Sequence, residues 1–375
     1  MALKKASLRF AGRATRAARR RLIEGRLRAG RALRPGPWWV QIGIDERCNY
    51  RCAMCSVHSH LLPPKAGKNI LPRDVFERLI AELRRLGTRR IEVCGSGEPM
   101  LHPEALHMLR LVKDAGMEAV LITNGSRLTP EVCREFANMS LDAVNVSVNS
   151  GTDETHHTIT QAPMGERARM MDALRQLVQY REERGAASPA VSVSIVIQKA
   201  NYREIVGLAR EVVELDLDNI EFVSLGINEA SRAMALDAEE AEEARRQVIE
   251  ADAMMRAAGK TTSAESYLAR PKEAYFTKEI FSQIPCHIGQ FFCRINVNGD
   301  VNPCCASCRV IGNVRQQSYR EIWSSPEYRA FRKEALDLPN RGRPVTDCFC
   351  YSCNHAALVV DYHRKLTEGR FSELF

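Results

Sequence analysis

The sequence lacks any apolar run long enough to cross a lipid bilayer, so no transmembrane helix is expected. Its basic N-terminal segment is not followed by the apolar stretch of a secretory signal either. Thirteen cysteines in a chain without an export signal indicate a reducing compartment, where thiols serve metals rather than disulfides, and we predict a cytoplasmic protein. With 375 residues, 45% hydrophobic and 27% charged, the chain is long enough for a full α/β core and a second, smaller domain.

Acidic residues are nearly absent from the first 35 residues, which hold twelve Lys or Arg and one acid, Glu24. The net charge is +8 for the whole chain and +11 for this segment, so the remaining residues carry −3. The basic character therefore belongs to an N-terminal arm, residues 1–37, whose Ala, Arg and Leu content predicts partial helix with a thin apolar stripe. One interpretation is contact of residues 1–34 with an anionic surface: acidic lipid, giving peripheral membrane contact, nucleic acid or an acidic peptide. A solvated extension is the alternative, and the segment also resembles an organelle transit peptide.

A fourth cysteine is missing from the loop that follows the first predicted strand, residues 38–44. The loop carries Cys48, Cys52 and Cys55 within eight residues. Thiolates in such a group bind soft metal centres. A structural zinc site and a fully ligated iron–sulfur cube each need four ligands, so three cysteines leave one metal position for a group that is not protein. A zinc loop or a merely reduced cysteine loop stays open as the alternative.

From Trp38 the chain alternates between strand and helix, which is typical of an α/β fold with a parallel sheet, either doubly wound or a curved partial barrel. Polar residues follow the strands where the carboxyl ends of parallel strands meet. They include the turn Gly95–Pro99, Asn124, Ser147 and Asn149, for which ordinary turn and cap chemistry is the alternative. The predicted strands are residues 38–44, 91–94, 119–123, 143–148, 191–197 and 220–225.

Eight of the thirteen cysteines lie between Cys286 and Cys353. An alternating segment, Cys293–Val297, precedes Asn298-Gly299-Asp300, and an Asn-Gly pair between alternating apolar residues is a strong hairpin signal. The hairpin is expected to bring Cys286 and Cys304 towards each other. A helix is predicted over residues 319–335.

The C-x3-C-x2-C spacing directly after a first strand resembles the signature of the radical S-adenosylmethionine (radical SAM) enzymes. The resemblance implies a six-stranded (β/α)6 partial TIM barrel in which Cys48, Cys52 and Cys55 hold a [4Fe–4S] cluster. S-adenosylmethionine (SAM) would chelate the open iron, and the turn after the second strand is similar to the family's GGE segment. The implied SAM contacts are Met54, Gly95, Ser96, Gly97, Glu98, Asn124, Ser147, Asn149, Val196 and Leu225.

The second cysteine group resembles the SPASM or twitch domain that binds auxiliary [4Fe–4S] clusters in these enzymes. The terminal cysteines form a compressed C-x-C-x2-C, and the longer SPASM series is not present, so we expect one auxiliary cluster rather than two. A zinc ribbon stays open as the alternative. The implied ligands are Cys286, Cys304, Cys350 and Cys353, with Cys293, Cys305, Cys308 and Cys348 as reserve or second-cluster ligands.

These features predict an enzyme that cleaves SAM to a 5′-deoxyadenosyl radical and takes hydrogen from its substrate, assisted by the auxiliary cluster. The substrate is expected to be a sugar, aminocyclitol or nucleoside, or a ribosomal peptide, and the electron donor a flavodoxin or ferredoxin. A zinc-binding, nucleic-acid-associated regulator is the alternative from another class. The expected division is an arm (1–37), a barrel (38–228), a helical connection (229–285), the auxiliary domain (286–356) and a tail (357–375).

Overall fold

The computed structural model describes residues 21–63, 69–268, 278–348, 350, 353 and 355–370. The part of the basic arm predicted over residues 1–20 lies outside these ranges. No helix in the described part of the chain is both long and apolar enough to span a membrane.

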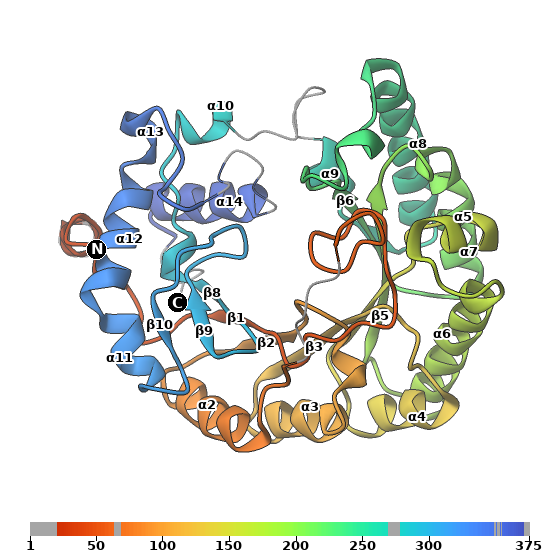
Figure 1. Cartoon of the computed structure of the whole chain (residues 1–375), viewed down its shortest axis with the longest axis horizontal. Coiled ribbons are helices and arrows are strands. Elements are labelled where there is room, and N and C mark those ends of the chain that lie inside the picture. The colour runs from red at the N-terminus through yellow and green to blue at the C-terminus, as the bar shows by residue number, and fades with distance from the viewer. Residues whose placement is uncertain are drawn as a thin grey trace, which may run out of the picture.

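The six strands expected from the sequence are all present and form one curved parallel sheet in chain order (Figure 1). They are β1 (Trp39–Ile42), β2 (Arg90–Val93), β3 (Glu118–Thr123), β4 (Ala143–Ser147), β5 (Ala190–Ile197) and β6 (Asn219–Ser224). Figure 1 shows the helices that follow the strands in the chain around the outside of this arc, while the loop after β1 lies on its inner side. These helices are α2 (Arg73–Arg85), α3 (Ala105–Asp114), α4 (Pro130–Asn138), α6 (Glu166–Glu183) and α7 (Ile205–Glu214).

Polar and apolar side chains alternate along the strands, which gives the curved sheet two different faces. In β5, Val191, Val193 and Ile195 are fully buried among the apolar core, while Ser192 points into a cavity inside the arc. Successive side chains of a strand point to opposite faces, so the apolar set packs under the helices and the polar set lines the interior. The strand sequence therefore builds a barrel-like wall with a polar inner surface.

The sheet continues beyond the six predicted strands on both sides. On one side β7 (Thr261–Thr262) pairs with β6, and on the other β8 (Phe292–Ile295) pairs in parallel with β1. The hairpin of β8 with β9 (Asp300–Asn302) is confirmed, and β10 (Gly312–Asn313) pairs with β9. The C-terminal cysteine region is thus hydrogen-bonded to the barrel as part of one ten-stranded sheet.

One helix prediction is wrong, and one segment is helical where no helix was predicted. The single helix expected over residues 319–335 is two helices, α11 (Tyr319–Ser324) and α12 (Pro326–Leu336), because Ser325 caps the second and Pro326 cannot continue the first. Most of the predicted tail forms α14 (Ala356–Thr367), whose Val359 is fully buried. The other helices are α5 (Asp153–Thr160), α8 (Ala238–Ala257), α9 (Ala264–Leu268), α10 (Lys278–Phe281), α13 (Leu338–Arg341), and the 3₁₀ turns η1 (Pro99–Leu101), η2 (Tyr202–Glu204), η3 (Arg232–Met234) and η4 (Ile288–Gln290).

Residues 21–34 of the basic arm are not a solvated extension. Residues 21–28 are helical, and Ile23 and Leu27 join the hydrophobic core. The Leu33 amide donates to Gln290 Oε1 at 3.0 Å, and Trp323 Nε1 donates to the Arg34 carbonyl at 3.1 Å. The described half of the arm therefore packs on the C-terminal cysteine region.

Leu27→Ala is expected to lower the free energy of unfolding by about 2–5 kcal/mol, the usual cost of a cavity at a buried leucine. Leu22, on the same helical segment, is 66% exposed, and Leu22→Ala is expected to change stability by about 0.5 kcal/mol or less. Urea denaturation of the two variants measures the difference. Equal effects would mean that the arm does not pack as described.

Candidate functional site

The loop with Cys48, Cys52 and Cys55 is held across the mouth of the barrel by α5, a helix that the sequence reading missed. The amides of Arg51 and Ala53 donate to carbonyls of α5, at Thr160 (3.0 Å) and Ile159 (2.7 Å). The Tyr50 hydroxyl donates to Glu166 Oε1 at the start of α6, at 2.9 Å. Backbone pairing between the loop and this helix fixes where the three thiols lie.

The three thiols lie close enough to interact electrostatically in a partly dehydrated environment. Burial raises the pKa of Cys48 to about 11, with the neighbouring Glu98 and Cys55 adding to it. Burial also raises the pKa of Cys52, and its causes include the charges of Cys48 and Cys55. Thiolates that repel each other at low dielectric are stabilised by a cationic metal centre, so this arrangement fits a metal cluster.

Backbone amides offer further stabilisation to these sulfurs. Cys55 Sγ accepts hydrogen bonds from the amides of Val57 (3.4 Å) and His58 (3.2 Å). Cys48 Sγ accepts one from Asn124 Nδ2 at 3.8 Å. Donors of this kind around ligating sulfur are the groups that tune iron–sulfur centres.

The turn Gly95–Pro99 lies directly against the cysteine loop. The Glu98 amide donates to the Arg47 carbonyl at 2.8 Å, and His58 Nε2 shares a hydrogen bond with the Ser96 carbonyl at 2.8 Å. A methyl group on Gly97 would lie 2.2 Å from the Arg47 carbonyl oxygen, so only glycine fits this close approach of two backbones.

Glu98 orders the strand ends around this turn. Its carboxylate accepts from the Thr123 hydroxyl (2.6 Å), the Asn124 amide (2.7 Å) and the Met100 amide (3.0 Å). Burial raises the pKa of Glu98, and these donors oppose the rise. The side chain predicted to contact SAM is thus directed at the protein, where it fixes the ends of β2 and β3.

Gly97→Ala is expected to displace the backbone before Cys48 and to destabilise the protein by about 1–3 kcal/mol, with weaker SAM binding. The matched control is Gly207→Ala in α7, where the added methyl group meets nothing within 4 Å. Thermal denaturation and equilibrium dialysis of labelled SAM give the two readouts. SAM affinity unchanged in Gly97→Ala would contradict a role for this turn.

The other predicted SAM contacts lie at the same edge of the sheet. Asn149 is buried, and its Oδ1 accepts from the Val196 amide at 2.8 Å, joining β4 to β5. Ser147 Oγ accepts from Ser194 Oγ at 3.4 Å. Leu225 is 2% exposed, and the Met54 carbonyl accepts from Asn228 Nδ2 at 3.2 Å. Asn228, which the sequence reading did not single out, links the loop after β6 to the cysteine loop.

Six thiols of the C-terminal region converge. The charges of Cys350 and Cys353 act on Cys286, and those of Cys353 and Cys286 act on Cys304. Cys305 is hydrogen-bonded to Cys304, and Cys348 to Cys350. The two reserve ligands Cys305 and Cys348 therefore lie beside predicted principal ligands, and either member of each pair is placed to ligate.

The other two reserve ligands lie apart from this group. Cys293 is fully buried on β8, where its sulfur accepts from the Tyr319 hydroxyl at 2.9 Å within an aromatic core. Cys308 is exposed to solvent. These positions argue against Cys293 and Cys308 as ligands of the same cluster, because a cube needs its four thiolates around one centre.

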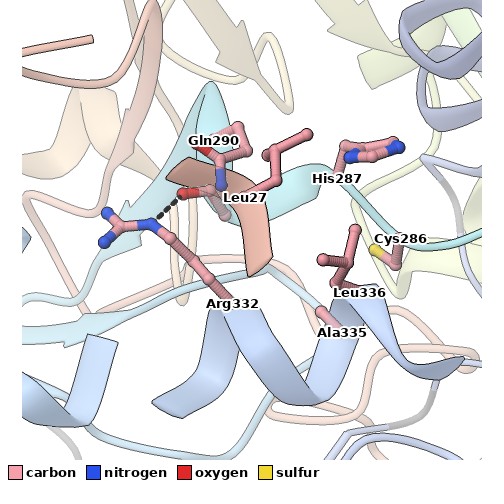
Figure 2. A pocket seen from close by; sticks show the side chains of 8 residues that line it. Leu27, Cys286, His287, Gln290, Arg332, Ala335 and Leu336 are labelled. Carbon is pink, nitrogen blue, oxygen red and sulfur yellow. Dashed lines mark hydrogen bonds between the residues drawn. The ribbon is translucent and has the colours of Figure 1, made fainter. Parts of the chain in front are cut away.

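The N-terminal segment and α12 enclose Cys286 from the other side. Figure 2 shows Leu27, Cys286, His287 and Leu336 around a small cavity of about 10 Å³, room for about one water molecule. Arg332 Nε donates to the Gly289 carbonyl at 2.8 Å beside it. Burial lowers the pKa of His287 to about 3, so this imidazole is neutral next to Cys286. The cysteine group is therefore shielded from solvent here.

A cavity of about 330 Å³ lies inside the barrel between strand side chains and His355. The sequence analysis did not predict its polar lining. Polar residues at alternate positions of otherwise apolar strands could have indicated it. The lining includes Gln41, Arg90, Glu92, Asn145, Ser192 and Glu221. His355 faces Cys305, whose charge raises the pKa of this imidazole against the opposing effect of burial. The cavity thus adjoins the C-terminal cysteine group.

Comparison with known proteins agrees with this geometry. Residues 44–212 match the model of the Radical SAM superfamily, and residues 286–354 match the SPASM iron–sulfur cluster-binding domain. The two cysteine groups fall within these two matches. The fold and its two cysteine sites define an iron–sulfur protein with two separate binding regions. The chain carries a radical SAM domain over residues 44–212 and a SPASM domain over residues 286–354.

Curated relatives have different activities. The chain is 31% identical over 182 residues to a tungsten-containing aldehyde ferredoxin oxidoreductase cofactor-modifying protein of Pyrococcus furiosus, covering 48% of this chain and 49% of the relative. It is 27% identical over 315 residues to an AdoMet-dependent heme synthase of Methanosarcina barkeri, covering 80% of this chain and 86% of the relative. The chain thus spans about half the length of the first relative.

Solved structures share the fold. The SuiB protein of Streptococcus suis bound to S-adenosylmethionine superposes with a TM-score of 0.64 at 15% identity, covering 84% of this chain and 73% of SuiB. The anSMEcpe protein with bound AdoMet superposes with a TM-score of 0.60 at 14% identity, covering 90% and 95% of the two chains. At this identity the likeness establishes the fold alone.

The cofactors follow from the two domains: the radical SAM domain binds a [4Fe–4S] cluster and SAM, and the SPASM domain binds auxiliary iron–sulfur clusters. The residues fit these groups, since each domain gathers enough thiols in a dehydrated setting. Within the described residues, no three His, Cys, Asp or Glu side chains are spaced to hold a single metal ion. The ligands of a cube bind different irons, so they stand farther apart than the ligands of one ion.

Proposed function

We propose that the protein is a radical SAM enzyme that abstracts a hydrogen atom from a substrate in the barrel and modifies it with the help of one auxiliary [4Fe–4S] cluster. The observation that carries the proposal is the group of three thiols, Cys48, Cys52 and Cys55, beside the Gly97 turn at the mouth of the sheet. When bound there, the cluster and SAM supply a 5′-deoxyadenosyl radical.

The chain's own residues bind and orient these groups. Cys48, Cys52 and Cys55 would hold three irons, and amides near Cys55 would stabilise the cluster's negative charge. The backbone of the Gly95–Pro99 turn would take the amino group of SAM, while Asn124, Ser147 and Asn149 would lie near its ribose. Glu98 keeps the turn and the end of β3 in register, so it acts as a positioning residue.

The auxiliary cluster would lie on the far side of the substrate. In support, His355 lines the barrel cavity and also faces Cys305 in the auxiliary cysteine group. Cys286, one of Cys304 and Cys305, one of Cys348 and Cys350, and Cys353 would ligate this cluster. It would accept an electron from the substrate radical in an oxidation, or anchor the substrate in a redox-neutral change.

Two substrate classes are proposed. One is a ribosomal peptide, supported by the fold shared with SuiB of Streptococcus suis, which has been solved bound to its precursor peptide SuiA. The other is a sugar, aminocyclitol or nucleoside, supported by a cavity of about 330 Å³ that suits one small polar molecule. A flavodoxin or ferredoxin would supply the electron, and the basic N-terminal arm would contact an anionic surface or an acidic peptide.

Anaerobic incubation of the reconstituted protein with SAM and dithionite is expected to release 5′-deoxyadenosine and methionine. Chromatography with mass detection measures both products, and protein without iron is the control. Colourless protein that binds zinc and shows salt-dependent DNA binding, without SAM cleavage, would favour the regulator instead.

A further inference from the structure

The barrel cavity holds unsatisfied polar groups, which are a sign of a missing ligand. Trp39 Nε1, Arg90 Nε and Asn145 Oδ1 are buried atoms without a hydrogen-bond partner within the described residues, and all three residues line this cavity. Asn145 is 4% exposed, so bulk water does not satisfy it. A bound molecule with both donors and acceptors would pair these atoms.

Two carboxylates share the same cavity. Glu92 is 5% exposed, and its Oε1 accepts from Gln41 Nε2 at 2.6 Å. Its Oε2 is 3.9 Å from Arg90 Nη2, beyond hydrogen-bond distance. Glu221 is hydrogen-bonded by Asn145, and burial together with the charge of Glu92 raises its pKa. The two acids therefore repel each other in a poorly solvated space.

The balance of charges on the cavity wall favours a cation. Arg90 is the one arginine or lysine among the lining residues, and it is partly exposed and lies over the Trp39 ring at 5.6 Å. The single positive charge of Arg90 neutralises one carboxylate at most. His355, the remaining titratable group on the wall, interacts with Glu92 as well as with Cys305. Arg90 is the one cation of the wall that acts on Glu221, and Glu92 shares it.

We propose that Glu92, Glu221 and Asn145 bind a primary ammonium group of the substrate. An ammonium group has three N–H donors, and these residues offer three acceptors: Glu92 Oε2, the Glu221 carboxylate and Asn145 Oδ1. Trp39 Nε1 and Arg90 Nε would donate to a hydroxyl or carbonyl oxygen of the same molecule. This inference rests on the proposed function, because it assigns the substrate of that same site. The ammonium has two sources, an amino sugar or the lysine side chain of a peptide.

Isothermal titration of the reconstituted full-length protein under anaerobic conditions tests this. One arm compares glucosamine with glucose, and the other compares acetyl-Gly-Lys-Gly-amide with its norleucine analogue. At least one amine is expected to bind about tenfold or more tightly than its uncharged partner, since charge-assisted hydrogen bonds carry that discrimination. The arm that shows the preference identifies the source.

Glu92→Gln and Glu221→Gln keep the shape but remove the charge, and each is expected to reduce the amine preference about tenfold. Ser192→Ala, on the same cavity wall, is the matched control and is expected to keep the preference. If the Glu92→Gln variant does not retain its iron–sulfur clusters, the Glu221→Gln variant is used for the test. Equal binding of amine and uncharged probes, no binding of either amine, or full preference in both variants would overturn the proposal. Cleavage of SAM, measured on the same samples, separates this failure from a failure of the proposed function.

Discussion

Cys52→Ala is expected to abolish SAM cleavage and to lower the iron content from about eight to about four atoms per chain. Cys52 is one of only three thiols in the loop after β1. The two thiols that remain are too few to bind the cluster with its full affinity. The auxiliary site draws its thiols from the other end of the chain, so its cluster is expected to persist. Iron and acid-labile sulfide determination, together with 5′-deoxyadenosine measurement, provides the readout.

The matched control for that variant is Cys133→Ala. Cys133 is buried in α4, where its thiol donates to the Ala173 carbonyl at 3.5 Å, away from either cysteine group. This variant is expected to lose some stability but to keep its iron and its SAM cleavage. Loss of iron in Cys133→Ala but not in Cys52→Ala would show that the ligands are misassigned.

Cys286→Ala is expected to remove the auxiliary cluster while SAM cleavage without substrate continues. Cys286 is partly buried and lies near Cys350 and Cys353, whose charges act on it. Iron is expected to fall to about four atoms per chain, and conversion of substrate to product is expected to stop. Iron analysis and separate assays of 5′-deoxyadenosine and of product distinguish the two effects.

Two further cysteines serve as controls for the auxiliary site. Cys308→Ala alters an exposed thiol and is expected to leave iron and activity unchanged. Cys293→Ala removes the acceptor of the Tyr319 hydroxyl, so it is expected to lower stability without loss of iron. Loss of about four irons in either variant would place it among the ligands.

Local signals in the sequence were sufficient for the barrel strands and the turn chemistry. Periodicity predicted all six strands from β1 to β6, and the Asn298-Gly299 pair predicted the β8–β9 hairpin. These features depend on residues close in sequence, where alternation and glycine or proline act directly. The cysteine spacing also pointed to the domain later matched by residues 44–212.

Long-range contacts were beyond such reasoning. The parallel pairing of β8 with β1 joins segments about 250 residues apart, and nothing in either strand specifies its partner. The packing of Leu27 beside Cys286 could not be predicted for the same reason, because these residues are far apart in the sequence. Glu92 and Glu221 were overlooked because acidic residues in short strands usually face solvent, and only the closed arc turns them inward.

Mössbauer spectroscopy of protein reconstituted with ⁵⁷Fe, recorded with and without SAM, tests the central claim most directly. We predict two cubes, one of which contains a single distinct iron whose signal shifts when SAM binds, since only Cys48, Cys52 and Cys55 hold that cube. The other cube should not respond to SAM. Two clusters with four equivalent thiolate-bound irons each, neither altered by SAM, would contradict the account.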